Sequence, residues 1–451
     1  MITEIQRMYY ETGQTREVEF RMKNLKLLQE TIRTYEEKIE SALWVDLRKS
    51  AYESYLTEIS IVLQELDEHI RNLWRWASPE RVSTPLHLLG SKSRIVYEPL
   101  GVVLVIAPWN YPFQLLMTPL IGAIAAGNCV VLKPSPYAPH VAAVISEMIA
   151  EIFGSAYVTV VQGGREANQV LLAEHFDHIF FTGGSELGKV VLKAAAEQLT
   201  PVTLELGGKS PCIVGCEANL EVAAKRITWG KFLNAGQTCI APDYLFVHDE
   251  VKTELLERIV FYIRKFYGEN PAESPDYPRI VRKEAVVRLL TLMKRGKVIC
   301  GGEVDVDKLY VAPTVLDNIT PDDPIMQQEI FGPLLPVLTF SELEEAVHYI
   351  NAHDKPLALY YFGSIHIAEQ VIASTSSGGV CVNDTIMHIA NGNLPFGGVG
   401  KSGMGRYHGY ESFLVFSNRR SVLRSTTWWD IPFKFPPYKS LSLLKKMPGF
   451  K

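Results

Sequence analysis

The sequence predicts an α/β protein whose core is a doubly wound, mostly parallel sheet, and three features support this prediction. Residues 101–107, 130–133 and 179–182 are continuous apolar runs of strand length, typical of strands buried on both faces of a sheet. Segments of helical length separate these runs, and such alternation indicates βαβ units. Turns rich in glycine or proline follow the strands, at the edge where such sheets bind their ligands.

Length and composition limit the class of protein. The chain has 451 residues, with 47% hydrophobic and 21% charged residues, which is ordinary for a globular protein. A net charge of −5 predicts no general attraction to nucleic acid or anionic membranes. The N-terminus lacks the pattern of a signal peptide. The sequence has no apolar run of about 18 or more residues, so no transmembrane helix is predicted.

Six cysteines are scattered along the chain, with no CxxC pair and no zinc-type spacing. The sequence therefore predicts neither a metal site nor a disulfide framework. This cysteine usage fits a reducing cytoplasm best.

Residues 3–76 are predicted to be helical. Apolar residues recur there at intervals of three and four: Leu28, Ile32, Tyr35, Ile39 and Leu43, then Tyr55, Ile59, Val62, Leu66, Ile70 and Leu73. Charged residues between them are expected on surface helices that pack one face on a core. Pro79 and Pro85 break helices, so residues 78–89 are predicted as a connection, followed by a strand at 93–97.

In the rest of the chain, strands and helices are predicted to alternate. Further strands are expected at residues 158–162, 202–206, 244–248, 335–339, 358–362 and 379–383. Helices are expected at residues 115–126, 141–152, 167–173, 219–234 and 250–266, and another after Gly188 that ends near residue 199. Residues 267–278, rich in proline, glycine and acids, are predicted to form a loop.

The central candidate for chemistry is Cys239, in the stretch Asn234-Ala-Gly-Gln-Thr-Cys. A thiolate can add to a carbonyl carbon, persist as a thioester and then leave. Gly236 would let the backbone approach a substrate closely, or adopt a positive φ, at no steric cost. The alternative is a buried cysteine that packs as a small hydrophobe.

Two polar residues near apolar runs are further candidates. Glu205 lies within the run 202–206, where desolvation would raise its pKa toward the range of a general base. The alternative is an edge-strand residue that faces water. Asn110, between two prolines, could donate to a developing oxyanion or serve ordinary turn chemistry.

Three other features could bind a nucleotide. Residues 183–188, Gly-Gly-Ser-Glu-Leu-Gly, lie between a strand and a helix, where free N–H groups can hold a phosphate, although their spacing is not GxGxxG and a tight turn is the alternative. Lys133 ends a strand and could bond ribose or phosphate, or be a solvated surface lysine. Glu329 could bind a ribose diol, or be an acid at a helix end.

Together these segments closely resemble the NAD(P)-dependent aldehyde dehydrogenase superfamily over nearly the whole chain. The motifs are Pro108-Trp-Asn-Tyr-Pro, Leu132-Lys-Pro-Ser, Phe181-Thr-Gly-Gly-Ser, Leu204-Glu-Leu-Gly-Gly-Lys, Gly236-Gln-Thr-Cys, Glu329-Ile-Phe-Gly-Pro and Leu394-Pro-Phe-Gly-Gly. The short N-terminus and four further segments are similar to the class 3 branch, which includes fatty and aromatic aldehyde dehydrogenases: Phe266-Tyr-Gly-Glu, Tyr310-Val-Ala-Pro-Thr, Val382-Asn-Asp and Ser402-Gly-Met-Gly-Arg-Tyr-His-Gly.

The resemblance implies a three-part architecture. A Rossmann-type NAD(P)-binding domain would comprise residues 1–78 and 100–204, and an α/β catalytic domain residues 205–390. Residues 79–99 and 391–451 would form a bridging and oligomerisation region with the C-terminal tail, which makes a homodimer.

The resemblance also implies the reaction, in which an aldehyde is oxidised to a carboxylic acid. Cys239 would be the nucleophile, Asn110 with the Cys239 backbone N–H would form the oxyanion hole, and Glu205 would activate the hydrolytic water. For the cofactor, NAD or NADP, Lys133 would bond the adenosine ribose and Glu329 the nicotinamide ribose. Further implied cofactor contacts are Gly183, Gly184, Ser185 and Gly188 at the pyrophosphate, Phe331 near the nicotinamide end, and Trp109.

Two departures from the family pattern stand out. Pro136 occupies the position where many members carry a glutamate that bonds the ribose 2′-hydroxyl, so repulsion of a 2′-phosphate is removed and NADP should be accepted alongside NAD. The C-terminus lacks the hydrophobic tail of membrane-bound fatty aldehyde dehydrogenases, so no transmembrane anchor is expected. The aromatic segment 428–437 is expected to pack on a neighbouring subunit or its own domain; a membrane surface or the substrate entrance are the alternatives.

Two rival functions remain open at this point. A CoA-dependent reductase or acylating dehydrogenase would use CoA in place of water, although Glu205 favours hydrolysis. A non-catalytic binding or structural protein on the same fold is disfavoured because Cys239, Glu205 and Asn110 are all present.

Overall fold

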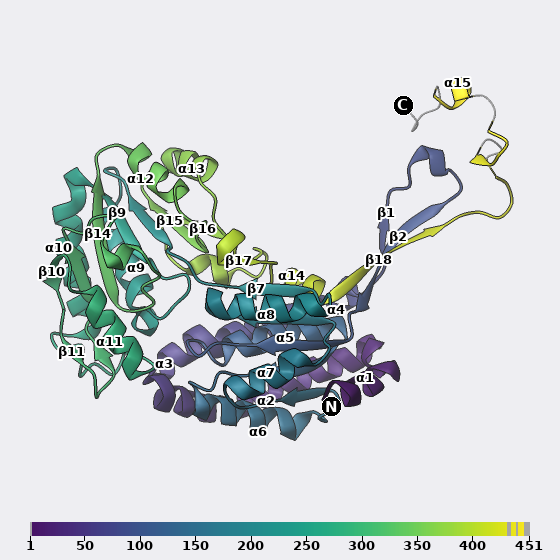
Figure 1. The fold of residues 1–451 in the computed structure, drawn as a ribbon, viewed down its shortest axis with the longest axis horizontal. Coiled ribbons are helices and arrows are strands. Elements are labelled where there is room, and N and C mark those ends of the chain that lie inside the picture. Colours follow the sequence, from purple (N-terminus) through teal and green to yellow (C-terminus); the bar gives the residue numbers. More distant parts are fainter. Residues whose placement is uncertain (1, 431–433, 439–440, 446–451) are drawn as a thin grey trace.

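The computed structural model describes residues 2–430, 434–438 and 441–445 of the chain. Its strands form a six-stranded sheet, a seven-stranded sheet, a three-stranded sheet and a short two-stranded ribbon. Figure 1 shows two α/β bodies side by side and an arm that projects from them.

Residues 2–76 are mainly helical, as predicted. Its elements are α1 (Ile2–Glu11), α2 (Val18–Leu47), α3 (Ala51–Ser54), a π-helical turn (Tyr55–Ile59) and α4 (Ser60–Trp76). The residues of the predicted stripe on α2 are all buried. Helix α2 packs against α4, α5 and α6, so the apolar stripe seals one side of the first α/β body.

The six-stranded sheet has the order β17-β7-β6-β3-β4-β5. Its strands are β3 (Val102–Ile106), β4 (Cys129–Lys133), β5 (Val158–Val160), β6 (His178–Thr182), β7 (Val202–Glu205) and β17 (Gly403–Met404). The first five are mutually parallel, whereas β17, from the C-terminal tail, pairs antiparallel with β7. Every residue of β3, β4 and β6 is buried, which explains why β3 is continuously apolar and why β4 and β6 carry polar residues only at their ends.

Helices connect the strands of this sheet. They are α5 (Gln114–Ala126), α6 (Pro139–Ile152), α7 (Arg165–Ala173) and α8 (Ser185–Glu197). The tail adds α14 (Tyr410–Val415), which packs on α5. The doubly wound parallel sheet expected from the sequence is therefore confirmed.

The seven-stranded sheet has the order β10-β13-β14-β9-β8-β15-β16, in which β10 alone of these strands is antiparallel to its neighbour. Its strands are β8 (Pro211–Val214), β9 (Tyr244–His248), β10 (Lys297–Cys300), β13 (Thr314–Asp317), β14 (Leu334–Phe340), β15 (Ala358–Phe362) and β16 (Gly379–Val382). Its helices are α9 (Leu220–Phe232), α10 (Lys252–Tyr267), α11 (Lys283–Leu292), α12 (Leu343–Asn351) and α13 (Ile365–Ser374). The ribbon pairs β11 (Val304–Asp305) with β12 (Tyr310–Val311).

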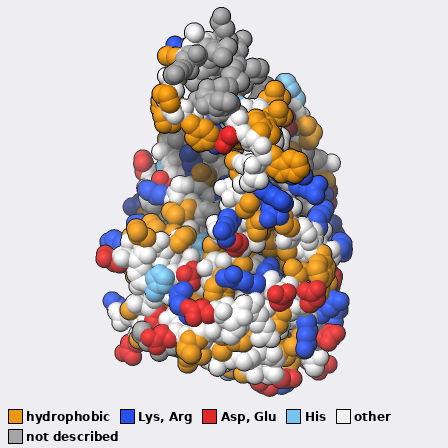
Figure 2. Space-filling view, turned by 90° about the vertical axis from the view of Figure 1, so that its right-hand side faces the viewer, with side chains coloured by type: hydrophobic (Ala, Val, Ile, Leu, Met, Phe, Trp, Pro, Cys, Tyr) orange, Lys and Arg blue, Asp and Glu red, His pale blue; other side chains and the backbone are white. Residues whose placement is uncertain are grey.

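The projecting arm is a three-stranded antiparallel sheet. It joins β1 (Glu80–Val82), β2 (Lys92–Pro99) and β18 (Ser417–Arg424), with β2 in the centre. Five apolar side chains are exposed near its end: Leu86, Leu89, Leu423, Trp428 and Trp429. Figure 2 shows hydrophobic surface in this upper part of the molecule. Beyond it the tail carries the short helix α15 (Leu441–Leu444). Residues 431–433, inside the aromatic segment singled out in the sequence, lie outside the described residues.

Two further expectations can be compared with the structure. Within the described ranges, no helix has both the length and the apolar composition needed to cross a bilayer. All six cysteines fall in those ranges and are free thiols.

Candidate active site

Four adjacent strands of the six-stranded sheet end at one edge, and a residue predicted for the site lies at each end. Lys133 ends β4, Asn110 lies in the loop after β3, Gly183 follows β6, and Glu205 ends β7. These strands are parallel and lie in the order β7-β6-β3-β4. The structure therefore brings the four residues to the carboxyl edge of the sheet, where ligands of this architecture bind.

Cys239 follows a strained turn between α9 and β9. Asn234, Ala235 and Gly236 are all left-handed, with φ of 52°, 51° and 72°, which costs on the order of 1 kcal/mol for each residue that is not glycine. A Cβ at position 236 would collide with the carbonyl oxygen of Gly332. The positive φ expected for Gly236 is confirmed, and its backbone closely approaches this neighbouring loop.

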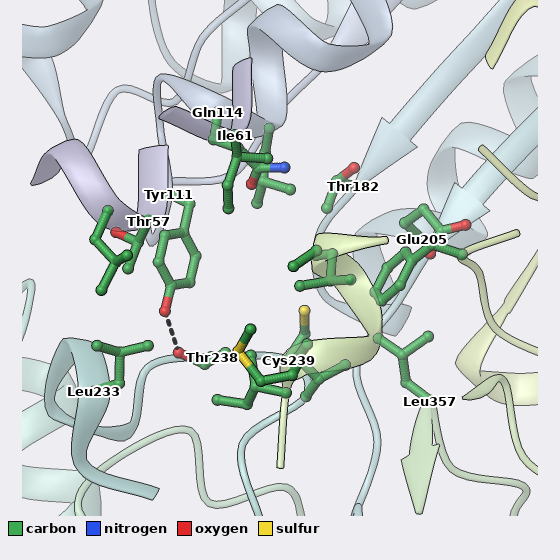
Figure 3. A pocket seen from close by; sticks show the side chains of 18 of the residues that line it. Thr57, Ile61, Tyr111, Gln114, Thr182, Glu205, Leu233, Thr238, Cys239 and Leu357 are labelled. Atoms are coloured by element: carbon green, nitrogen blue, oxygen red, sulfur yellow. Dashed lines mark hydrogen bonds between the residues drawn. The ribbon is translucent and has the colours of Figure 1, made fainter. Parts of the chain in front are cut away.

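A cavity of about 250 Å³ lies in front of Cys239, and Glu205 lines it too (Figure 3). Most of the other lining residues are apolar: Leu56, Ile61, Leu115, Trp229, Leu233, Ile240, Ile386, Met387 and Phe396. On its wall, the hydroxyls of Tyr111 and Thr238 form a 2.6 Å hydrogen bond. The cavity is therefore a largely apolar space whose lining includes one cysteine and one glutamate.

The Cys239 thiol is half-buried and lines this cavity, so it is not sealed in the core as a small hydrophobe would be. Burial, together with the neighbouring Glu329 and Glu205, raises the pKa of the thiol to about 12. In the protein without ligands the thiol is therefore the predominant form, and a rise in pH favours the thiolate.

Glu205 does not face water, so the alternative of a solvated edge residue is wrong. Its strand is paired on both sides, by β6 and β17, and the residue is 3% exposed. Neither carboxyl oxygen has a hydrogen-bond partner among the described residues. Burial raises the pKa of Glu205 well above its usual value, and the nearby Arg406 opposes this shift. Such a carboxyl keeps its proton to a higher pH than an exposed glutamate does, and it becomes a base as the pH rises.

Asn110 contacts the cysteine loop from behind the cavity. It is 2% exposed and is not one of the residues that line the cavity. Its Nδ2 donates a 3.0 Å hydrogen bond to the carbonyl oxygen of Gln237, two residues before Cys239. Asn110 therefore joins the loop after β3 to the cysteine loop, which a simple turn residue would not do.

Lys133 is buried, so the alternative of a solvated surface lysine is wrong. Its Nζ donates to the carbonyl oxygens of Pro134, at 2.8 Å, and Gly163, at 2.7 Å. Burial lowers the pKa of the ammonium group, and no carboxylate pairs with it in the described structure. A buried ammonium that contacts carbonyls alone has donor capacity for the hydroxyls of a ligand.

Glu329 is a second acid at this edge, half-buried as a residue and with its Oε1 enclosed. Its carboxylate packs so closely on Gly207 that any Cβ there would collide with it. Its Oε1 has no hydrogen-bond partner among the described residues, and the Gly208 N–H contacts the carboxylate. Burial, and then repulsion from Asp243, raise the pKa of Glu329 to about 8. An unsatisfied buried carboxylate is suited to accept hydrogen bonds from a diol.

Two aromatic rings flank this region, since the ring centroids of Trp109 and Phe331 are 5.4 Å apart. Gly184 is the N-cap of α8, and Ser185 is its first residue. The N–H groups of a first helical turn are free to hold a phosphate. A Cβ at Gly188 would lie 2.8 Å from Leu206, so glycine lets α8 pack closely here. These residues, with Lys133 and Glu329, fit a nicotinamide dinucleotide along the carboxyl edge.

Charged residues that were not singled out in the sequence fix the loop that carries Glu329. Lys209 pairs with Asp243 and donates to two carbonyls of that loop, each at 2.9 Å. Asp243 accepts a 2.9 Å hydrogen bond from the N–H of Ile330, and Arg288 donates to the Glu329 carbonyl over 3.2 Å. Lys209 is the last residue of the motif Leu204-Glu-Leu-Gly-Gly-Lys. Its place in that motif was the sequence feature that could have identified it as a residue of the site.

One group of donor atoms lies apart from the cavity. The ligating atoms of Cys216, His248 and Glu250 are within 4.8 Å of one another, and none of these residues lines the cavity. They follow or end the adjacent strands β8 and β9, and their separation in sequence gave no zinc-type spacing.

A cysteine and a buried glutamate that line one cavity, beside an edge that fits a dinucleotide, are the features of a dehydrogenase that acts through covalent catalysis. The chain belongs to the aldehyde dehydrogenase family, whose sequence profile matches residues 7–422. It is therefore an NAD(P)-dependent enzyme that oxidises an aldehyde to a carboxylic acid, as the motifs implied.

Similar proteins place the chain near the class 3 branch. It is 49% identical to 4,4'-diaponeurosporen-aldehyde dehydrogenase of Staphylococcus aureus (96% of this chain, 95% of the relative), and 45% identical to aldehyde dehydrogenase family 3 member B1 of Mus musculus (96% and 93%). It is 46% identical to the dimeric NADP-preferring aldehyde dehydrogenase of Rattus norvegicus (92% of each). A solved structure of S. aureus AldH in a substrate-bound state has a TM-score of 0.95 at 47% identity (97% and 96%).

Proposed function

We propose that Cys239 is the nucleophile, that Glu205 is the general base for hydrolysis, and that Asn110 and the Cys239 backbone N–H stabilise the oxyanion. The observation that carries this proposal is that Cys239 and Glu205 both line one cavity. The Asn110 amide, whose Nδ2 already contacts the cysteine loop, has a second N–H for the substrate oxygen.

The proposed reaction begins when the Cys239 sulfur bonds to the aldehyde carbon, which gives a thiohemiacetal oxyanion beside Asn110. When bound, the nicotinamide ring accepts the hydride that leaves this carbon. The carbon is then a thioester carbonyl on Cys239. Glu205 removes a proton from water, whose oxygen attacks the thioester, and the sulfur leaves as the carboxylic acid forms. An assay without CoA tests this step, because an acylating enzyme would stop at the thioester.

For the cofactor, we propose that Lys133 bonds the adenosine ribose and that Glu329 accepts from the nicotinamide ribose. Residues 183–185 and Gly188 would lie along the pyrophosphate, and Trp109 and Phe331 would flank the nicotinamide end. The support is the buried donor capacity of Lys133, the unsatisfied Glu329 carboxylate and the free start of α8.

Both cofactors are expected to work. Pro136 provides no carboxylate to repel a 2′-phosphate, and one relative is named for its preference for NADP. We therefore expect kcat/KM for NADP to lie within about tenfold of that for NAD, whereas a glutamate at this position would favour NAD.

Steady-state kinetics with each cofactor at a saturating aldehyde concentration check this prediction. Pro136→Glu is the matched variant, and its NAD/NADP ratio should rise. A preference of the native protein for NAD above about a hundredfold, roughly 2.7 kcal/mol, would contradict it.

The apolar lining of the cavity supports an aldehyde with an extended apolar or aromatic body as the substrate. One relative is named for a long apolar aldehyde, 4,4'-diaponeurosporen-aldehyde. Each buried CH₂ contributes about 0.8 kcal/mol, so four more methylenes should raise kcat/KM about a hundredfold or more.

A panel of short, long-chain and aromatic aldehydes tests this expectation, with NAD(P)H formation as the signal. Replacing a lining residue, Ile61→Asp, should lower kcat/KM for the long chains much more than for the short ones. Equal kcat/KM values along the alkanal series would exclude an apolar binding cavity.

We further propose the domain division implied by the family, with residues 1–78 and 100–204 binding the cofactor and residues 205–390 carrying the catalytic cysteine. Residues 79–99 and 391–451 would bridge two subunits of a homodimer, although β17 and α14 of that segment belong to the body of the six-stranded sheet. The exposed apolar end of the arm and a relative named as dimeric support this proposal. Six free thiols support a reducing, cytoplasmic location.

A further inference from the structure

Asn234 ties together the two loops on which the proposed chemistry depends. Its Nδ2 donates to the carbonyl oxygen of Asn110 over 2.7 Å and to that of Gln237 over 3.2 Å. The Asn110 side chain donates to the same Gln237 oxygen over 3.0 Å. The Asn234 amide therefore spans the loop after β3 and the loop that leads to Cys239.

The conformation of Asn234 is itself imposed from outside its loop. Its backbone is left-handed, and its N–H donates to Oε1 of Glu53 over 2.9 Å. Glu53 belongs to α3 and is 7% exposed. A helix far away in sequence thus holds the first residue of the strained turn before Cys239.

The lysine of a buried ion pair also donates a hydrogen bond to the Asn110 carbonyl oxygen. Lys49 Nζ lies 2.6 Å from Glu58 Oε1, and both side chains are fully buried. The same Nζ donates to the Asn110 carbonyl over 3.3 Å. Glu58 Oε2 accepts from the N–H groups of Phe113, at 2.8 Å, and Gln114, at 3.2 Å. Both charges of the pair are therefore used to hold the chain that carries Asn110.

We propose that Asn234 and the Lys49–Glu58 pair are positioning residues, which fix the Asn110 amide relative to the Cys239 sulfur so that the oxyanion is stabilised as the carbon–sulfur bond forms. This inference rests on the proposed roles of Cys239 and Asn110. Neither Asn234 nor Lys49 lines the cavity, so both act through the two loops.

Several features distinguish this arrangement from ordinary packing. Buried charges and left-handed residues other than glycine are costly, and they persist where the surrounding structure imposes them. Here two donors from different segments converge on one acceptor, the Asn110 carbonyl. In an active site, the unfavourable free energy of buried charge and backbone strain is offset because the reacting groups are held in a fixed geometry.

The first test is Asn234→Gly. Glycine adopts positive φ without strain, so this variant removes the amide clamp and keeps the backbone turn accessible. We expect the rate constant for the first turnover of NAD(P)H, measured by stopped flow, to fall about a hundredfold because the oxyanion donor is misplaced. Alkylation of Cys239 by iodoacetamide needs no oxyanion hole, and its rate should stay within about threefold of wild type.

The second test removes both charges of the pair with Lys49→Met/Glu58→Gln. Replacing both partners of a buried ion pair is far less destabilising than replacing one, and glutamine still accepts from the N–H groups of Phe113 and Gln114. The first-turnover rate constant should fall about tenfold as the Asn110 carbonyl loses one donor. Lys38→Met/Glu147→Gln is the matched control: this 2.8 Å lysine–glutamate pair is exposed, and its variant should keep the wild-type rate.

The outcomes separate this inference from the proposed function. First-turnover rates near wild type in both variants would overturn the positioning role, as would an equal loss of turnover and of alkylation, which indicates a collapsed loop. If the native protein forms no NAD(P)H, or forms it without Cys239, the proposed function fails instead. Fluorescence titration of NADH should give dissociation constants within about tenfold of wild type in every variant, because most of the proposed cofactor residues, Lys133, residues 183–188 and Glu329, receive no hydrogen bond from Asn234, Lys49 or Glu58.

Discussion

Cys239→Ala is expected to abolish aldehyde-dependent NAD(P)H formation and to leave dinucleotide binding close to wild type. The alanine side chain cannot bond to the aldehyde carbon, so the covalent route is lost and kcat should fall by about 10⁴-fold or more. The residues proposed to bind the cofactor lie on other segments, at the ends of β4 and β6 and in the loop before β14. Initial rates and a fluorescence titration of NADH measure the two properties separately.

Cys300→Ser is a suitable control for this variant. Cys300 is also half-buried, but it lies on the edge strand β10 and does not line the cavity. Its serine variant should keep the native rate. Wild-type turnover in Cys239→Ala, or loss of turnover in Cys300→Ser alone, would contradict the assignment of the nucleophile.

The sequence predicted the parallel sheet well because of how that sheet is buried. Strands β3, β4 and β6 are covered on both faces, so their sequences are continuous apolar runs that periodicity reveals. The apolar stripe on α2 was also predicted correctly, because a surface helix buries one face and its apolar residues therefore recur at intervals of three and four. The short strands were harder. Strand β8 has four residues between a glycine-rich turn and another glycine, and β17 has two residues from the distant tail.

The candidate site was predictable in part. The residues at strand ends, such as Lys133 and Glu205, could be found because parallel strands place their carboxyl ends at one edge. Sequence alone left open whether they were buried, since that depends on neighbours such as β17. The Lys49–Glu58 pair had no readable signal: both residues look like ordinary charges on surface helices until the fold buries them against the Asn110 loop.

Glu205→Gln is expected to separate the two halves of the reaction. Formation of the thioester needs the sulfur and the oxyanion donors, whereas its hydrolysis needs a base. The variant should therefore release about one equivalent of NAD(P)H per site in a rapid first turnover, and then turn over about 10² to 10⁴ times more slowly than wild type. Stopped-flow absorbance resolves the burst from the steady state.

The pH dependence of this variant gives a sharper test of the same role. Burial raises the pKa of Glu205 well above its usual value, so the base form of the carboxyl grows as the pH rises through this raised pKa. The steady-state rate of the native enzyme should rise with it. Glutamine has no such proton to lose, so the slow steady-state rate of the variant should lose this dependence. The burst should still accelerate with pH in both proteins, because the Cys239 thiol, with a pKa of about 12, must also lose a proton. A variant without a burst, or one whose steady state keeps the native pH profile, would show that Glu205 is not the base for hydrolysis.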